Sequence, residues 1–330
     1  MRKRSVGSSL LATVPLILLA ATLAFWVITA MSLRVGGALS ATASQEAVRR
    51  TADDIVTSLK EGRTEQADAL FNGWVGIAGG SSNAYIALAS EIIKAGRPMD
   101  AARYLTAATA KKEVNWDPML WATLAEAQNK VSDTGQSKLS AAEAERRAEA
   151  FTKGEPKTPK AKVDTLDRIN RLNQVAAYYS DIKKEPSRAV ALLEEALRLD
   201  ENVQTLNALG YTLADKGSTT AEFNRAIELT KKAVAKAPGN PIVLDSYGWA
   251  LFKKNDLQGA RRVLREAVDA APMIAEIRYH LGVVYAQLGL TTDAAREFDR
   301  ALVLDPENKG ITEAKHRLRQ PAGQGILEKA

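Results

Sequence analysis

A fixed 34-residue spacing in the last third of the chain constrains the fold more than any other feature of the sequence. Gly248 and Gly282 are 34 residues apart. The same interval separates three further pairs of residues: Ala260 and Ala294, Ala267 and Ala301, and Pro272 and Pro306. Each period holds two segments whose apolar residues follow helical spacing, so the sequence predicts an all-α solenoid of stacked helical hairpins.

These two copies resemble the tetratricopeptide repeat family. In the last copy the motif positions of that family are filled by Leu281, Gly282, Tyr285, Ala294, Phe298 and Pro306. Arg278 stands where the motif has its tryptophan. The copy before it keeps the glycine, both alanines and the proline. The resemblance implies helical pairs that stack into a curved array, whose first helices line a groove for protein partners.

Small residues at fixed positions have a physical role in such an array. Two helices cross closely only where a side chain is missing. The packing gained by this close approach outweighs the roughly 1 kcal/mol by which glycine destabilises a helix. Proline ends one helix before the next repeat begins. The predicted structural motif comprises Gly210, Gly248, Gly282, Ala260, Ala294, Ala267, Ala301, Pro238, Pro272 and Pro306.

Weaker copies extend the pattern towards the N-terminus. Gly210 precedes Gly248 by 38 residues, and we place the four extra residues between two helices, within residues 218–225. Gly62 and Gly96 are again 34 apart, and each stands five residues before an alanine. A further copy over residues 117–151 requires an insertion around residues 132–138. We therefore expect about seven hairpins.

The N-terminus predicts a membrane anchor. No residue from Ser5 to Leu33 is charged, and about 20 apolar residues suffice to span a bilayer. The basic residues Arg2, Lys3 and Arg4 before this run favour a cytoplasmic N-terminus. We expect a single-pass protein of the inner membrane of a Gram-negative bacterium, with everything after Arg34 in the periplasm. Cleavage of a signal peptide after Ala43 stays open as an alternative.

Composition excludes several classes of protein. The chain has no cysteine and two histidines, so we expect no metal and no cofactor. The net charge of +6 gives little support to nucleic-acid binding, because four of the excess positive charges lie within residues 1–34. None of the common catalytic motifs for hydrolases or nucleotide-binding enzymes is present. We therefore expect a protein that is not an enzyme.

The predicted partner site is the concave face formed by the first helices of the last three copies. Helical spacing from each repeat start places seven residues there: Asn207, Tyr211, Asp245, Trp249, Phe252, Tyr279 and Val283. Aromatic side chains of this kind are common anchors in protein interfaces. The alternative is that Trp249 and Phe252 only pack between repeats. His280 falls on a variable position, and we assign it no catalytic role.

The expected organisation follows from these segments. Residues 1–34 form the basic tip and transmembrane helix, 35–156 degenerate repeats, 157–169 a basic linker with proline, 170–308 clear repeats, 309–320 a capping helix and 321–330 a flexible tail. We expect a membrane-anchored scaffold that holds a protein or peptide segment in its groove during assembly or maturation of a cell-envelope complex. Two alternatives are a holder of an unfolded secreted client, such as an apocytochrome in cytochrome c maturation, and a regulatory subunit of a membrane enzyme.

Overall fold

The computed structural model describes residues 38–78, 81–153, 165–306 and 308–318. Its α-helices are α2 (Ala38–Lys60), α3 (Thr64–Ala78), α4 (Ser82–Lys94), α5 (Pro98–Thr109), α6 (Pro118–Lys130), α7 (Thr134–Thr152), α8 (Thr165–Ala177), α9 (Pro186–Leu199), α10 (Val203–Lys216), α11 (Thr220–Lys236), α12 (Pro241–Lys253), α13 (Leu257–Ala270), α14 (Ala275–Gln287), α15 (Thr291–Leu304) and α16 (Lys309–Leu318). A π-helical turn, η1 (Tyr178–Ile182), extends α8.

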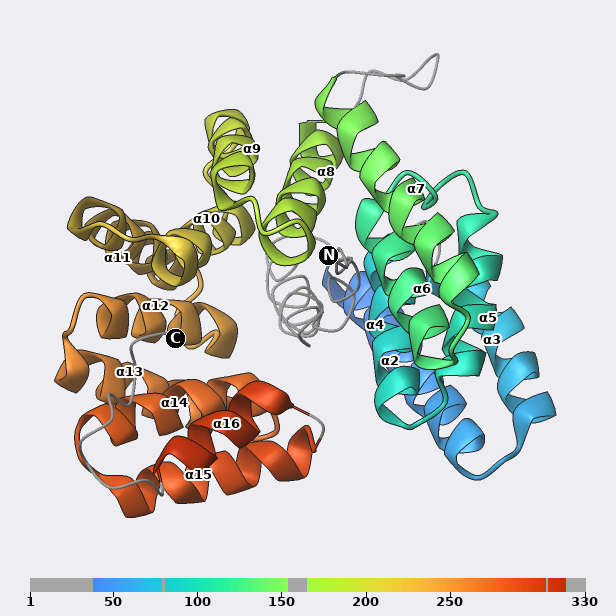
Figure 1. Ribbon diagram of the computed structural model, residues 1–330. Coiled ribbons are helices and arrows are strands. Elements are labelled where there is room, and N and C mark those ends of the chain that lie inside the picture. The colour runs from blue at the N-terminus through green and yellow to red at the C-terminus, as the bar shows by residue number, and fades with distance from the viewer. Residues whose placement is uncertain (1–37, 79–80, 154–164, 307, 319–330) are drawn as a thin grey trace, which may run out of the picture.

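Within these ranges the helices pair into seven hairpins, from α2–α3 to α14–α15, and α16 packs against the last of them. The predicted all-α solenoid of about seven hairpins is thereby confirmed. The hairpins follow one another around an open arc (Figure 1). Each first helix packs against the next first helix along the chain, so the first helices lie on the inner side of the arc and the second helices on the outer side.

The predicted membrane-spanning segment and the C-terminal tail at 321–330 lie outside the described residues. Among the residues that are described, no helix combines the length and the apolarity needed to cross a bilayer. The linker prediction of 157–169 is too long at its C-terminal end, because α8 already begins at Thr165. The reason is that Ile169 and Leu172 continue the apolar spacing of α8 and are buried, and no proline after Pro159 interrupts it.

The motif glycines lie where the two helices of a hairpin cross. A Cβ atom added to Gly282 would lie 2.6 Å from Cε1 of Phe298, and one added to Gly248 would lie 2.6 Å from Cγ of Leu264. At Gly210 the added atom would meet Thr230, whose Cγ2 would be 2.6 Å away. These distances are too short for any side chain, so glycine sets the separation of the two helices in each of these hairpins.

We expect Gly282→Ala to lower the free energy of unfolding by about 1 kcal/mol, because overpacking against the buried Phe298 ring exceeds the gain in helix propensity. Gly76 is a matched control on α3, where an added Cβ has no atom within 4 Å. Gly76→Ala is expected to raise stability by about 0.5–1 kcal/mol. Urea unfolding followed by circular dichroism measures both, and a gain in both variants would contradict the crossing role of Gly282.

The turns within the hairpins correct two predictions about inserted residues. Ser132, with a φ of 64°, takes the same turn position as Gly96, with a φ of 75°, and α7 begins two residues later. No insertion therefore lies at residues 132–138, and the extra length belongs to α7.

Similarly, α11 begins six residues before Ala226, whereas α13 begins three residues before Ala260. The extra residues mostly lengthen α11, because Thr219 and Glu222 form a capping box that starts the helix early.

Candidate functional site

The concave face of α10, α12 and α14 is the candidate site, and it differs from the predicted trough. Four of the seven predicted residues are buried: Asn207, Asp245, Trp249 and Val283. Trp249 is only 3% exposed, so a partner does not reach its ring. Tyr211, Phe252 and Tyr279 are half-buried and keep part of their rings at the surface. The structure therefore favours the alternative in which Trp249 packs between repeats.

Trp249 joins three consecutive repeats. Its ring stacks on Phe252, with ring centroids 4.8 Å apart, and on His280, with ring centroids 4.1 Å apart. Its indole Nε1 donates a hydrogen bond to Oδ1 of Asp215 at 3.3 Å. Because Asp215 belongs to α10 and His280 to α14, the indole of α12 fixes the positions of both neighbouring first helices.

A buried ion pair lies beneath this ring. Nδ1 of His280 is 2.9 Å and 3.0 Å from the two carboxylate oxygens of Asp245, and His280 is 3% exposed. Burial alone lowers the pKa of His280, but the charge and the hydrogen bond of Asp245 outweigh it and the net pKa is raised. The raised pKa favours the charged imidazole, and the contact of His280 with Asp245 links α14 to α12.

Glu276 and Tyr211 complete the network. Nε2 of His280 lies 4.0 Å from Oε1 of Glu276, and the hydroxyl of Tyr211 donates to the same oxygen at 3.2 Å. Burial raises the pKa of Glu276 to about 7, while the positive charge of His280 opposes that shift. The contact between Tyr211 and Glu276 passes over α12, so the concave face curves tightly enough to bring α10 and α14 together.

The surface that a partner reaches surrounds this network. Lys216, at the end of α10, pairs with Asp215 at 2.5 Å. Lys253, at the end of α12, lies with Nζ 5.6 Å from the Trp249 ring centroid, and burial lowers its pKa. Phe252, which adjoins Lys253 in the chain, and Tyr279, whose ring centroid lies 5.7 Å from that of His280, each expose part of their rings. The accessible part of the concave face thus combines aromatic rings with Lys253 and the Lys216–Asp215 ion pair.

The arrangement offers binding and no evident chemistry. Asp245 and His280 have the geometry of a base and its orienting carboxylate, but the imidazole is buried and its free nitrogen faces Glu276. In the described part of the chain, no group of three His, Cys, Asp or Glu side chains is placed to hold a metal ion.

Helical spacing could not identify the buried pair. Asp245 and His280 are 35 residues apart, about one repeat, so they lie on adjacent first helices at nearly equivalent positions. An acid and a histidine at this interval were a signal for a salt bridge between repeats. His280 falls on a position that varies between the repeats, and its buried side chain is central to the packing of α12 and α14.

Comparison with known proteins agrees with this class of architecture. A tetratricopeptide repeat family model matches residues 248–309. The TPR repeat-containing protein PA4667 of Pseudomonas aeruginosa is 37% identical over 110 residues, which cover 32% of this chain and 18% of that protein. The interferon-induced protein with tetratricopeptide repeats 2 of Cricetulus griseus is 30% identical over 123 residues, covering 37% of this chain and 25% of the relative. The chain thus spans at most a quarter of either relative.

Two solved structures are similar at low identity. YrrB, described as a TPR protein with an unusual peptide-binding site, has a TM-score of 0.36 and 18% identity, and the match covers 66% of this chain and 100% of YrrB. PilW, described as a widely conserved type IV pilus biogenesis factor, has a TM-score of 0.42 and 15% identity, with 70% of this chain and 97% of PilW covered.

The paired helices and the concave face define a helical-repeat solenoid, a class whose inner surface binds other proteins. Residues 248–309 match the tetratricopeptide repeat family, and the hairpins before them have the same helical-pair architecture.

Proposed function

We propose that this chain is a non-enzymatic scaffold, anchored in the inner membrane by residues 5–33, which holds a protein segment on its concave face in the periplasm during assembly or maturation of an envelope complex. The observation that carries the binding role is that Phe252, Lys253 and Tyr279 keep part of their side chains exposed around the buried network of Trp249 and His280. Aromatic rings and long cationic side chains favour a partner segment with apolar and acidic residues. The uncharged run from Ser5 to Leu33 supports the anchor.

The interior network supports a rigid groove in this proposal. Trp249, Asp245, His280 and Glu276 fix α10, α12 and α14 relative to one another before any partner arrives. A preorganised surface loses little conformational entropy on binding, which favours affinity. The buried residues therefore serve the site by shaping it, while Phe252 and Tyr279 make the contacts.

Site-specific photocrosslinking in cells tests this assignment. A photoreactive phenylalanine at Phe252, on the concave side, is expected to form a discrete adduct with one partner protein. The same residue at Asn224, which is exposed on α11 at the outer side, is the matched control and is expected to form none. Equal adducts at both positions, or no adduct at Phe252 in cells that grow normally, would overturn the concave site.

A further inference from the structure

The network beneath Trp249 brings three carboxylates and one imidazole together from three consecutive first helices. Asp215 lies on α10, Asp245 on α12, and Glu276 and His280 on α14. Nδ1 of His280 is within hydrogen-bond distance of Asp245, and the charges of Glu276 and Asp215 also act on its pKa. Because the imidazole is buried, water screens these interactions only weakly. Protonation of one residue therefore affects contacts between all three helices.

Other charged and titratable side chains surround this network. They are Tyr211 and Lys216 of α10, Lys253 of α12, Tyr279 of α14, and Arg317 of α16, whose charge acts on Tyr279. Burial acts to raise the pKa of Asp215, but the charge and the hydrogen bond of Lys216 outweigh it, so this carboxyl stays ionised. For Glu276, by contrast, His280 is the cation that acts most strongly. The charge of Glu276 is therefore coupled to that of His280.

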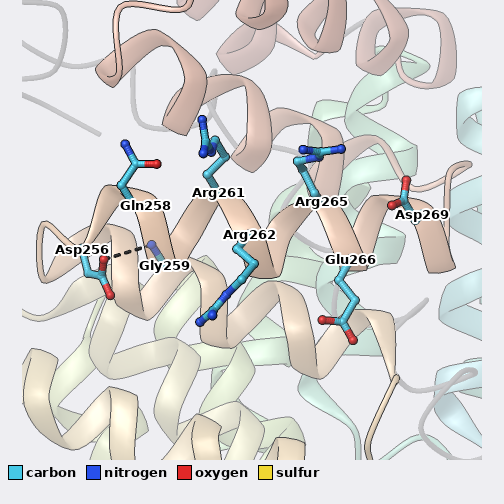
Figure 2. A pocket seen from close by; sticks show the side chains of 8 residues that line it. All are labelled: Asp256, Gln258, Gly259, Arg261, Arg262, Arg265, Glu266 and Asp269. Carbon is cyan, nitrogen blue, oxygen red and sulfur yellow. Dashed lines mark hydrogen bonds between the residues drawn. The ribbon is translucent and has the colours of Figure 1, made fainter.

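The two second helices that pack against α14 place their charges away from this network. Toward α15, Arg278 pairs with Glu297 at 2.6 Å. Toward α13, burial raises the pKa of Tyr285, and the positive charges of Arg265 and Arg261 oppose that shift. Figure 2 shows both arginines on the same side of α13. The acids that act on the buried imidazole thus come from α10, α12 and α14 itself.

Loss of two protons changes the balance of charge in the network. While His280 is charged and Glu276 is neutral, the imidazolium offsets Asp245, and Lys216 offsets Asp215. As the pH rises through the pKa values of His280 and Glu276, the imidazole becomes neutral and Glu276 becomes an anion. Asp245 then shares the buried network with a second carboxylate and has lost its counter-charge. Removing the partner of a buried charge is strongly destabilising.

Separation of α14 from α10 and α12 relieves this cost, because it lets water reach the carboxylates. The contacts that tie α14 into the network end on the two titrating residues. Asp245 and the ring of Trp249 contact His280, and Tyr211 contacts Glu276. We propose that the concave face is a proton-operated device, in which α14 stays against α10 and α12 while the network holds its protons and moves away from them when it loses them.

This device regulates the concave site, and in that respect it rests on the proposed function. Phe252 lies on α12 and Tyr279 on α14, so movement of α14 changes the spacing of these two partly exposed rings. A surface that is no longer preorganised binds less tightly. A partner segment is therefore held below neutral pH and released above it.

Pulsed electron paramagnetic resonance between two spin labels tests the movement in the full chain, purified in detergent and without a partner. The chain has no cysteine, so labels attach only to Ser218→Cys, just after α10, and Gln287→Cys, at the end of α14, both at exposed positions. The distance between the labels is expected to lengthen, and its distribution to broaden, between about pH 6 and about pH 8.5.

Two variants of the labelled chain identify the groups responsible. His280→Gln combined with Glu276→Gln removes both titrating groups and is expected to give the same label distance at both pH values. His316→Gln, on the exposed histidine of α16, is the matched control and is expected to keep the shift of the unmodified chain. An unchanged distance in the unmodified chain, or an equal shift in the double variant, would overturn the proposal.

Photocrosslinking measures the effect on the site itself. With the photoreactive phenylalanine at Phe252, in permeabilised cells buffered at the same two pH values, the yield of the partner adduct is expected to fall at least about fivefold at the higher pH. A constant yield alongside a lengthened label distance would overturn the regulation of the site. Absence of an adduct at both pH values, with a lengthened distance, would support the movement of α14 and count against the binding site alone.

Discussion

Replacing Trp249 with alanine is expected to lower the free energy of unfolding by about 4 kcal/mol, the range measured for large buried aromatic residues. The indole is 3% exposed, stacks on Phe252 and His280, and donates a hydrogen bond to Asp215. Its removal leaves a cavity between three repeats and leaves the carboxylate of Asp215 without this donor. Urea unfolding of the purified chain, followed by circular dichroism, measures the loss.

Trp116 is the matched control for this substitution. It is half-buried, and its ring centroid lies 4.3 Å from the guanidinium carbon of Arg171. Trp116→Ala therefore removes one partly exposed cation–π contact, one exposed hydrogen bond to the carbonyl oxygen of Glu113 and little core volume, so the expected loss is about 1 kcal/mol. Similar small losses in both variants would show that Trp249 does not hold the first helices together.

The stability of the chain is expected to fall by about 2 kcal/mol as the pH rises from about 5 to about 8. Two groups act in the same direction. The pKa of His280 is raised in the folded state. The stabilisation by its charge is therefore fully present below pH 6.5, the ordinary pKa of histidine, and is lost as the pH rises through the pKa of the folded state. The pKa of Glu276 is raised from 4.5 to about 7. Between these pH values the folded state keeps a proton that the unfolded state releases, so the free energy of unfolding falls as the pH rises through this interval.

His280→Gln is expected to flatten the upper part of this pH dependence. His316, on α16, is the only other histidine in the chain and is exposed, so His316→Gln is expected to leave the pH dependence as it is in the unmodified protein. Chemical denaturation at a series of pH values measures all three proteins. A stability that rises between pH 6 and pH 8, or an unchanged slope in His280→Gln, would contradict the proposed charge state of the network.

Much of the fold was predictable because it depends on local patterns. The spacing of Gly248 and Gly282, with the alanines and prolines that follow, records where helices cross and where they end. The turn glycines Gly62 and Gly96 revealed weak copies in the first half, because a positive φ recurs at that turn. These signals need no knowledge of how the hairpins curve around one another.

The accessibility of the site was not predictable from such patterns. Helical spacing places Asp245 and Trp249 on the inner face, but it does not say how tightly that face curves. The contact of Tyr211 with Glu276, two repeats further on, shows that the curve is tight enough to cover the indole between them. The prediction of the face was therefore useful, while the choice of contact residues within it required the packing of three repeats.

Protease accessibility of the C-terminus tests the membrane-anchored scaffold most directly. A C-terminal tag on the full chain, in spheroplasts of a Gram-negative host, is expected to be digested by external protease without opening the inner membrane, and the undigested protein is expected to keep its full mass. A cytoplasmic tagged protein serves as the control for membrane integrity. Protection of the tag until the inner membrane is permeabilised would place the repeats in the cytoplasm and contradict the account.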